Sequence, residues 1–310
     1  MNTISTSELS TSEWRELRTN FIGGSDVAAV LGASSYKTPF VVWLEKTGQL
    51  PTDHGTPITQ FGNLFEGVAR DEFRKTMKVN VTEPSAMFIH PEYPMLAGNV
   101  DGVIQSSLHD GKGILEIKTT TTHRVSPYDL PDSIPIEYTL QVQQYLGVTG
   151  FAYAYLQIFF RDTCEFAEPI YIPRDDELIR KNNQQLSEWW TNHVETRTPP
   201  PMKTTEDLIL RYPGSNGVYK EASAMMAKKY RLLLSIRERI SGLNALKESV
   251  EFDLKEFCAD AEGIAIDNQP VVSWRSSERN SMDITAFRKD HPDLYKSYLK
   301  TSQTRTFKLK

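Results

Sequence analysis

Strand-like apolar segments in the middle of the chain limit the fold more than any other feature. Residues 153–160 form a nearly continuous apolar run rich in aromatic and branched side chains, as in a long strand. Similar segments occur at residues 87–90, 95–104, 114–119 and 167–172. A helical pattern at residues 138–146 lies between the first three strands and the last two. This order predicts a mixed α/β core.

Further helical patterns flank the strand-like segments. Cap residues, apolar spacing and proline or glycine boundaries place them. They begin near Ser12 and continue at residues 27–31, 38–48, 60–77 and 175–195. Residues 60–77 have apolar side chains at helical spacing, which predicts one buried face.

Three consecutive prolines, Pro199 to Pro201, are the clearest break in the chain. Proline cannot continue a helix, and a proline run favours an extended spacer. We therefore predict a core domain over residues 1–198 and a mainly helical C-terminal region over residues 199–310.

The C-terminal region has two distinctive patterns. Residues 220–260 carry a heptad-like apolar stripe, which predicts either an intramolecular helical hairpin, with a bend at Gly242, or an intermolecular coiled coil. A small hairpin is expected around Asp267 and Asn268, followed by a helix over residues 283–298. Residues 274–310 contain nine Lys and Arg against four Asp and Glu, a net charge of +5, which fits either a polyanionic partner or a solvated helical face.

The overall charge excludes one class of nucleic-acid-binding protein. The chain has 35 Lys and Arg against 40 Asp and Glu, a net charge of -5, so it does not coat nucleic acid by bulk positive charge. Two cysteines cannot build a disulfide framework, and the polar N-terminus lacks the order of a signal peptide. No apolar run has the roughly 18–20 residues of a membrane span, so we expect a cytoplasmic protein.

The segment with the clearest chemistry is the strand that contains Glu116 and Lys118. Residues two apart on a strand share a face, so the acid and the amine emerge together, while Ile117 points to the core. Asp101 joins them if its strand forms a hairpin with theirs. Two converging carboxylates suit Mg²⁺, and a nearby lysine can position a water for attack on phosphorus. Taken alone, a Glu-x-Lys pair is also a common surface ion pair.

Aspartate followed, after a gap, by Glu-x-Lys on a β-hairpin resembles the PD-(D/E)XK nuclease signature. The surrounding blocks resemble the lambda-type exonuclease or YqaJ-like viral recombinase branch of that superfamily. These blocks occur in the family's order, at Arg18 with residues 22–26, then at residues 61–66, 99–102, 115–118 and 141–145. One departure is Asn99-Val100 before Asp101, where the family has a proline. The resemblance covers about half the chain and implies a restriction-endonuclease-like core, with a central mixed sheet flanked by helices.

The resemblance also assigns roles at a metal site. It implies that Asp101, Glu116 and the backbone carbonyl of Ile117 bind Mg²⁺, for which Mn²⁺ can substitute. Lys118 would position or activate the attacking water. Glu66 would add a carboxylate, although a solvent-facing helix position is the alternative. Gln141 would support the water or the metal shell, with Gln143 as the second choice.

The resemblance further implies that Arg18 and Ser25 hold the 5′-phosphate of the digested strand. A Gly-Gly-Ser turn entering a helix exposes backbone N–H groups and a hydroxyl, which can hold a phosphate beside an arginine. The same tripeptide is also an ordinary loop before a helix cap.

The resulting expectation is a Mg²⁺-dependent 5′–3′ exonuclease that acts on double-stranded DNA ends and leaves 3′ single-stranded tails. The resemblance implies a phage or prophage recombination protein, a single-strand-annealing partner and a homotrimeric ring. Two alternatives remain: an endonuclease or nickase that needs no DNA end, and a recombination adaptor that works through residues 202–310. No phosphate-binding Gly-x-x-x-x-Gly-Lys-[Ser/Thr] loop is present, so nothing indicates an ATP-driven motor.

Overall fold

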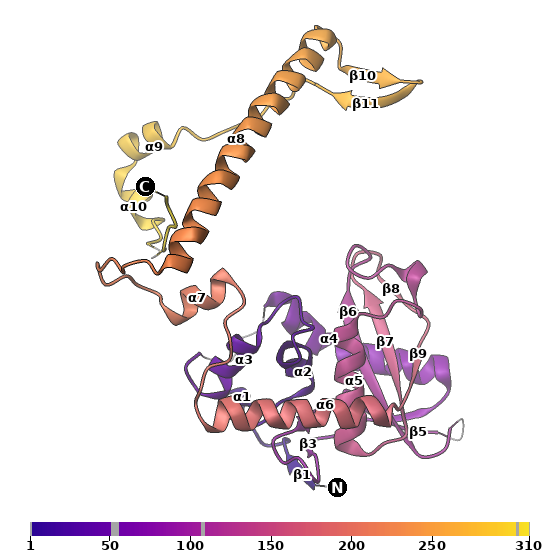
Figure 1. Ribbon diagram of the computed structural model, residues 1–310. Coiled ribbons are helices and arrows are strands. Elements are labelled where there is room, and N and C mark those ends of the chain that lie inside the picture. The colour runs from indigo at the N-terminus through magenta and orange to yellow at the C-terminus, as the bar shows by residue number, and fades with distance from the viewer. Residues whose placement is uncertain (1, 51–55, 107–108, 302–303, 310) are drawn as a thin grey trace. The chain divides into compact units, whose positions relative to one another are not determined.

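The computed structural model describes residues 2–50, 56–106, 109–301 and 304–309, and it divides into two compact units (Figure 1). The first unit spans Met1–Arg211 and the second spans Tyr212–Lys310. The division falls later than the predicted boundary after residue 198, because α7 (Thr205–Arg211) packs into the first unit. Asp207 of this helix is fully buried and accepts a hydrogen bond of 2.7 Å from the Thr38 hydroxyl.

A curved mixed sheet forms the centre of the first unit. Its strands run in the order β2 (Asn80–Thr82), β5 (Gly102–Gln105), β6 (Lys112–Thr120), β7 (Tyr153–Phe160) and β8 (Glu165–Phe166), and β9 (Ile170–Pro173) also pairs with β7. Strands β5 and β6 are antiparallel, whereas β6 and β7 are parallel. Every residue of β7 is buried, as its apolar sequence predicts. The predicted mixed α/β core is therefore confirmed.

The predicted strand over residues 95–104 is wrong as a single element. The chain forms β4 (Ala97–Gly98) in a small sheet with β3 (Ala86–Ile89) and β1 (Asn2–Ser5), and then enters the central sheet as β5. Residues 99–101 lie between the two sheets, and the polar Asn99 and Asp101 leave the ladder there. The predicted strand over residues 167–172 is too long, since only its second half is strand, as part of β9, and β8 lies just before it. The break between β4 and β5 places Asp101 at a strand end, where its side chain is available for chemistry.

Helices cover both faces of the central sheet. Helix α4 (Pro57–Met77) buries Ala69 and Phe73 against one face, together with Ile117 of β6. Helix α5 (Ile136–Thr149) lies on the other face, and α6 (Asp176–Trp189) and α2 (Gly24–Val30) pack against α5. The remaining elements of this unit are α1 (Thr11–Thr19), α3 (Pro39–Lys46), a 3₁₀ turn at Pro127–Asp129 and a π-helical end to α6 at Trp190–Glu195. The first helix begins slightly earlier than the predicted start near Ser12, because Ser10 and Glu13 make a capping box before α1, whereas Thr38 caps α3 as predicted.

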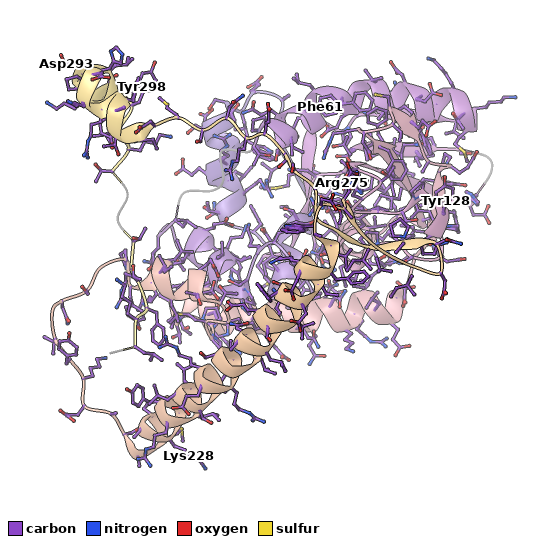
Figure 2. All side chains as sticks on the ribbon, turned by 90° about the horizontal axis from the view of Figure 1, so that it is seen from above. Phe61, Tyr128, Lys228, Arg275, Asp293 and Tyr298 are labelled. Atoms are coloured by element: carbon purple, nitrogen blue, oxygen red, sulfur yellow. The ribbon has the colours of Figure 1, made fainter. Side chains whose placement is uncertain are left out.

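The second unit contains one long helix, a hairpin and two short helices. Helix α8 (Ala224–Cys258) runs for 35 residues without a break, so the predicted bend at Gly242 and the intramolecular helical hairpin are wrong. Residues of high helix propensity surround Gly242, and they outweigh the cost of a single glycine. Side chains project along the whole helix, which carries Lys228 in its first turns (Figure 2).

The end of the chain follows the predicted order with one break. Strands β10 (Gly263–Ile266) and β11 (Gln269–Ser273) form the predicted hairpin, and both turn residues, Asp267 and Asn268, have positive φ. The predicted helix over residues 283–298 is two helices, α9 (Ile284–Asp290) and α10 (Pro292–Ser297), because Pro292 ends the first. No helix within the described residues combines the length and apolar character needed to cross a membrane.

Candidate active site

Strand β6 supplies the acid and the amine at the centre of the site. The Lys118 Nζ donates to Glu116 Oε1 over 2.6 Å, so the two side chains share a strand face as predicted. This pair is not a surface ion pair, because Glu116 is only 1% exposed. Its other oxygen, Oε2, is buried and has no hydrogen-bond partner. A buried carboxylate oxygen without a partner is costly, so this atom is a candidate ligand for a cation.

Asp101 reaches the same place from the neighbouring strand. Gly102 of β5 lies opposite Leu115 of β6, so the expected hairpin pairing is present and Asp101 falls beside Glu116. The Asp101 carboxylate accepts the backbone N–H of Ile117 over 2.7 Å. In an extended strand, the N–H and C=O of one residue point to the same side, so the Ile117 carbonyl also faces Asp101.

Helix α5 closes the site over Glu116. The Gln141 amide donates to Glu116 Oε1 over 2.7 Å and accepts from Lys118 Nζ over 3.0 Å, so it links the acid to the amine. Gln143 lies elsewhere: it donates to the Pro173 carbonyl and accepts from the Asp175 N–H. The structure thus brings the first-choice glutamine, and not the second, to the acidic centre.

Glu66 enters from helix α4 and lines the same cleft. Its side chain is half-buried, which differs from the solvent-facing alternative. Burial, together with the nearby charge of Asp101, raises the pKa of Glu66 to about 7. One turn later, Arg70 donates to the Asp101 backbone carbonyl over 2.9 Å and forms an ion pair with Glu83.

The acidic centre contains more carboxylates than the single amine of Lys118 can neutralise. Burial and the neighbouring Asp101 raise the pKa of Glu116 to about 8, and burial raises the pKa of Asp101 as well. Burial alone would lower the pKa of Lys118, but Glu116 and Asp101 outweigh it, and the pKa of the amine is raised. The centre therefore holds surplus negative charge that a cation would neutralise.

The donor set fits a hard divalent cation. Three carboxylates and a backbone carbonyl are the oxygen ligands that Mg²⁺ takes, usually alongside water and phosphate oxygens. Among the described residues, no three His, Cys, Asp or Glu side chains already surround a common point at binding distance. The fit therefore rests on the type of donor, on the partnerless Glu116 Oε2 and on the surplus charge.

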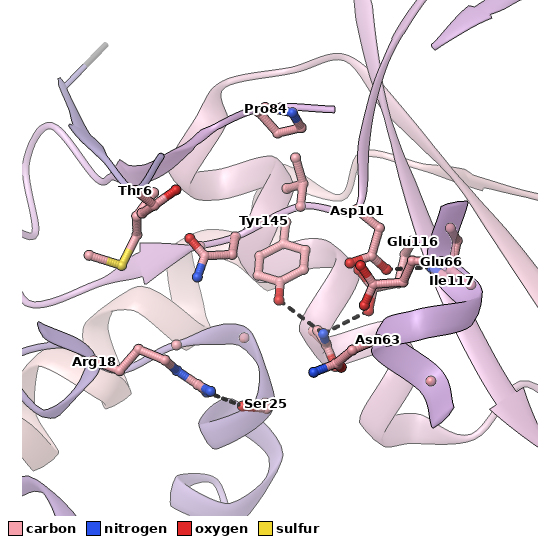
Figure 3. Close-up of a pocket in the computed structure, with 18 of the residues that line it drawn as sticks. Thr6, Arg18, Ser25, Asn63, Glu66, Pro84, Asp101, Glu116, Ile117 and Tyr145 are labelled. Atoms are coloured by element: carbon pink, nitrogen blue, oxygen red, sulfur yellow. Dashed lines mark hydrogen bonds between the residues drawn. The ribbon is translucent and has the colours of Figure 1, made fainter. Parts of the chain in front are cut away.

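Arg18 and Ser25 meet at the other side of the cleft (Figure 3). The Arg18 Nη2 donates to Ser25 Oγ over 2.9 Å, and the guanidinium lies 4.7 Å from the centre of the Trp14 ring. The turn before α2 is held by backbone hydrogen bonds from Ile22 to Met95 and from Ala97 to Ile22. The structure thus joins two residues seven positions apart into one polar group.

Tyr145 connects the two sides of the cleft and was not predicted as a site residue. Its hydroxyl accepts from the Gln141 amide over 3.0 Å. Its ring packs so closely on Gly24 and Gly98 that a Cβ atom at either glycine would lie 2.4 Å or 2.7 Å from it. The spacing of four residues from Gln141 on a helix is the sequence signal that could have identified it.

The two groups line one cleft of about 680 Å³. Asn63 and Thr119 also line it, and sequence reasoning singled out neither of them. The cleft thus has an acidic centre on one side, a guanidinium and a hydroxyl on the other, and Tyr145 between them (Figure 3). Such a cleft can hold a phosphodiester between a cation-binding centre and an anion-binding group.

Comparison with known proteins identifies relatives of this chain. Residues 13–152 match the model of the YqaJ-like viral recombinase domain family. Protein YqaJ of Bacillus subtilis (strain 168) is 32% identical over 312 residues, which cover 98% of this chain and 95% of the relative. The crystal structure of an alkaline exonuclease from Laribacter hongkongensis is similar in fold, with a TM-score of 0.51 at 21% identity, over 61% of this chain and 94% of that one. The same exonuclease is also known in complex with dAMP.

Proposed function

Because this chain belongs to the YqaJ-like viral recombinase family, we propose that it is a Mg²⁺-dependent exonuclease that degrades one strand of double-stranded DNA ends from 5′ to 3′. Its product would be duplex with a 3′ single-stranded tail, the substrate for recombination by strand annealing. The observation that carries the proposal is the buried group of Asp101, Glu116 and Lys118, with Gln141 hydrogen-bonded across it. The exonuclease activity named for the structural relative supports it.

The residues of the centre have separate tasks in this reaction. Asp101, Glu116, the Ile117 carbonyl and Glu66 would hold Mg²⁺. When bound, Mg²⁺ supplies charge neutralisation at the phosphate and lowers the pKa of water. Lys118 would orient the attacking water through its remaining N–H, since Glu116 and Gln141 accept from the ammonium and hold it in place. Gln141 keeps Glu116 Oε1 engaged, so that Oε2 would remain free to hold the cation.

The polarity of digestion rests on the opposite side of the cleft. Arg18 and Ser25 present a guanidinium and a hydroxyl at the start of α2, two groups that can bind an anion. A 5′-phosphate held there would place the first phosphodiester of the same strand toward the acidic centre. This arrangement supports a preference for 5′-phosphorylated ends.

The test uses linear duplex DNA with and without a 5′-phosphate, in Mg²⁺, and compares the wild type with Lys118→Ala and Glu116→Gln. We expect each substitution to reduce digestion by about 100-fold or more. Lys112→Ala and Glu165→Gln, at exposed positions of β6 and β8, are matched controls and should digest normally. Undiminished digestion by both active-site variants would refute the assignment. Cleavage of closed circular DNA would instead favour an endonuclease.

We propose the assembly and the partner from the same family membership. A homotrimeric ring would give processivity by encircling the DNA, which suits a chain with a net charge of -5. A single-strand-annealing protein is the expected partner for the 3′ tail. A sedimentation mass of one subunit at micromolar concentration contradicts the ring. Removal of the second unit after Arg211 tests whether the annealing partner binds there.

A further inference from the structure

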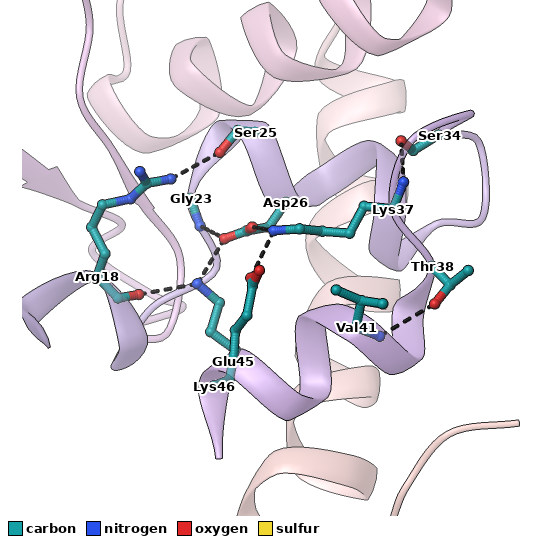
Figure 4. Close-up of polar contacts among 10 residues, drawn as sticks. All are labelled: Arg18, Gly23, Ser25, Asp26, Ser34, Lys37, Thr38, Val41, Glu45 and Lys46. Carbon is teal, nitrogen blue, oxygen red and sulfur yellow. Dashed lines mark hydrogen bonds and ion pairs between the residues drawn. The ribbon is translucent and has the colours of Figure 1, made fainter. Parts of the chain in front are cut away.

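A buried cluster of charged side chains lies beneath the turn that carries Ser25 (Figure 4). Asp26 of α2 and Lys46 of α3 form its centre, 2.7 Å apart, and each side chain is only 3% exposed. Lys37 and Glu45 complete it, with 2.6 Å between Lys37 Nζ and Glu45 Oε2. This cluster has no part in the proposed chemistry, yet it adjoins both Arg18 and Ser25, the two residues proposed to bind the 5′-phosphate.

Asp26 is fully engaged by this cluster. Its Oδ2 binds Lys46 and accepts the Gly23 N–H over 3.2 Å, and its Oδ1 lies 3.4 Å from Lys37. Lys46 donates in addition to the Arg18 backbone carbonyl over 3.0 Å. Lys46 therefore touches both the acid beneath the turn and the main chain of the arginine above it.

When Arg18 is counted with the cluster, the positive charges exceed the negative charges by one. Asp26 and Glu45 balance Lys37 and Lys46, so the Arg18 guanidinium remains the surplus positive charge. Arg18 makes no ion pair with a carboxylate among residues 2–50, 56–106, 109–301 and 304–309, and its contacts are Ser25 and the Trp14 ring. Burial alone would raise the pKa of Asp26, but Lys46, Lys37 and Arg18 together lower it far below its ordinary value. Asp26 is thus a permanent anion beside Arg18.

The Arg18 guanidinium and the Asp26 carboxylate are close enough to form an ion pair after a change of rotamer. A Cβ atom placed on Gly23 would lie 3.7 Å from Arg18 Nη2 and 3.7 Å from Asp26 Oδ2. Twice that distance, 7.4 Å, is therefore the upper limit of the separation between Arg18 Nη2 and Asp26 Oδ2. If Asp26 lost Lys46, a rotamer change would bring it to Arg18 as a bidentate partner, in the geometry that a phosphate would otherwise take.

We propose that Lys46 is a positioning residue: it retains Asp26 in the buried cluster and thereby keeps Arg18 free to bind the 5′-phosphate of the DNA end. The inference rests on the proposed function, since it assigns a role toward the same phosphate. Lys46 does not touch the phosphate. It determines which anion Arg18 binds.

The test measures the preference for a 5′-phosphate in binding, without catalysis. The ratio of dissociation constants for a fluorescent duplex with a 5′-hydroxyl and with a 5′-phosphate is determined by anisotropy in EDTA. We expect Arg18→Ala and Lys46→Met each to reduce this ratio by about tenfold relative to the wild type. Lys46→Arg, which retains the charge, should keep it, and so should Lys75→Met at an exposed position of α4.

The double variant Asp26→Asn/Lys46→Met separates positioning from a merely structural role. Removing both charges leaves no carboxylate to capture Arg18, so we expect the ratio to return to within about threefold of the wild type. If Lys46→Met does not fold, as judged by its thermal melting, the double variant still decides. A double variant without the preference overturns the proposal.

The remaining outcomes distinguish this inference from the proposed function. A wild type with no preference, unchanged in Arg18→Ala, overturns the phosphate role of Arg18 and this proposal with it. A preference that Arg18→Ala abolishes and Lys46→Met leaves intact overturns the role of Lys46 alone. Undiminished DNA digestion in Mg²⁺ by Lys118→Ala and Glu116→Gln, with an intact binding ratio, would count against the metal centre and would leave this proposal standing.

Discussion

Two groups of buried charges border the same cleft, and they are opposite in balance. Around Glu116, three carboxylates share one lysine, and burial with mutual repulsion raises the pKa of Glu116 to about 8 and that of Glu66 to about 7. Around Asp26, two carboxylates share two lysines and an arginine, and the pKa of Asp26 is lowered. The first group lacks a cation and the second has one to spare. Under the proposed function, this contrast would let an acidic protein hold a DNA end at one place without bulk positive charge.

The largest effect is expected from Asp101→Asn, which removes one charge from the acidic group but keeps an acceptor for the Ile117 N–H. DNA digestion in Mg²⁺ should fall by about 100-fold or more, because a neutral amide is a poor substitute for a carboxylate ligand. The rate of release of nucleotides from a linear duplex measures it. Asp71→Asn, at an exposed position of α4, should digest at the wild-type rate. Similar rates for both variants would exclude Asp101 from the centre.

The stability of the metal-free protein should reveal the surplus negative charge. The pKa of Glu116 is higher in the folded protein than in the unfolded chain, so the folded state binds the extra proton and its stability falls as pH rises from about 4.5 to about 8. Glu116→Gln has no such proton to lose. In EDTA at pH 8 it should be more stable than the wild type by on the order of 2 kcal/mol, with a smaller difference at pH 5.

Urea unfolding at pH 5, 6.5 and 8 measures this difference. Glu165→Gln, at an exposed position of β8, should show no change with pH relative to the wild type. A stability difference that is the same at all three pH values would mean that the pKa of Glu116 is ordinary.

The two glutamines of α5 should separate catalysis from packing. Gln141→Ala removes the hydrogen bonds to Glu116 and Lys118 and should reduce digestion by about tenfold. Gln143→Ala removes bonds to the Pro173 carbonyl and the Asp175 N–H, so it should lower the melting temperature by a few degrees and leave the rate unchanged. Rate and melting temperature are measured on both variants. The opposite pattern would make Gln143 the functional glutamine.

The smallest expected effect has the opposite pH dependence. Since the pKa of Asp26 is lower in the folded protein, its contribution to stability is present above about pH 4 and is lost as pH falls below that value. Asp26→Asn/Lys46→Met should therefore lose less stability than the wild type between pH 5 and pH 3, by about 1 kcal/mol. Thermal melts at these two pH values test it. If both proteins lost the same stability between pH 5 and pH 3, the pKa of Asp26 would not be lowered, and the contrast with the Glu116 group would not hold.

The sequence predicts the acidic centre around Glu116 better than the charged surroundings of Arg18 and Ser25. Glu116 and Lys118 are two residues apart on a strand, so local periodicity alone places them on one face. The family resemblance implies Gln141, with Gln143 on a different helical face as the second choice, and the structure brings Gln141 to Glu116. The cluster beneath Ser25 was missed. Its members come from two helices and a loop, and no local spacing relates Asp26 to Lys46.

The secondary-structure elements show the same division between features that local sequence predicts and features that depend on distant residues. The apolar run of β7 and the turn at Asp267 and Asn268 are local signals, and both predictions are confirmed. The break between β4 and β5 and the unbroken course of α8 through Gly242 were predicted wrongly. The break between β4 and β5 depends on which strands pair, and the course of α8 depends on helix propensity summed over the whole helix. A short stretch of sequence contains neither kind of information.

The sequence by itself thus determined the family, the mixed α/β core and the residue types of the proposed cation-binding centre, because each depends on short-range spacing or on motifs in order. Tertiary structure decided which atoms meet: Tyr145 between the two groups, Glu66 beside Asp101, and Asp26 held by Lys46 beneath Arg18. Burial and charge–charge distance determine how these groups ionise, and both exist only once the chain has folded.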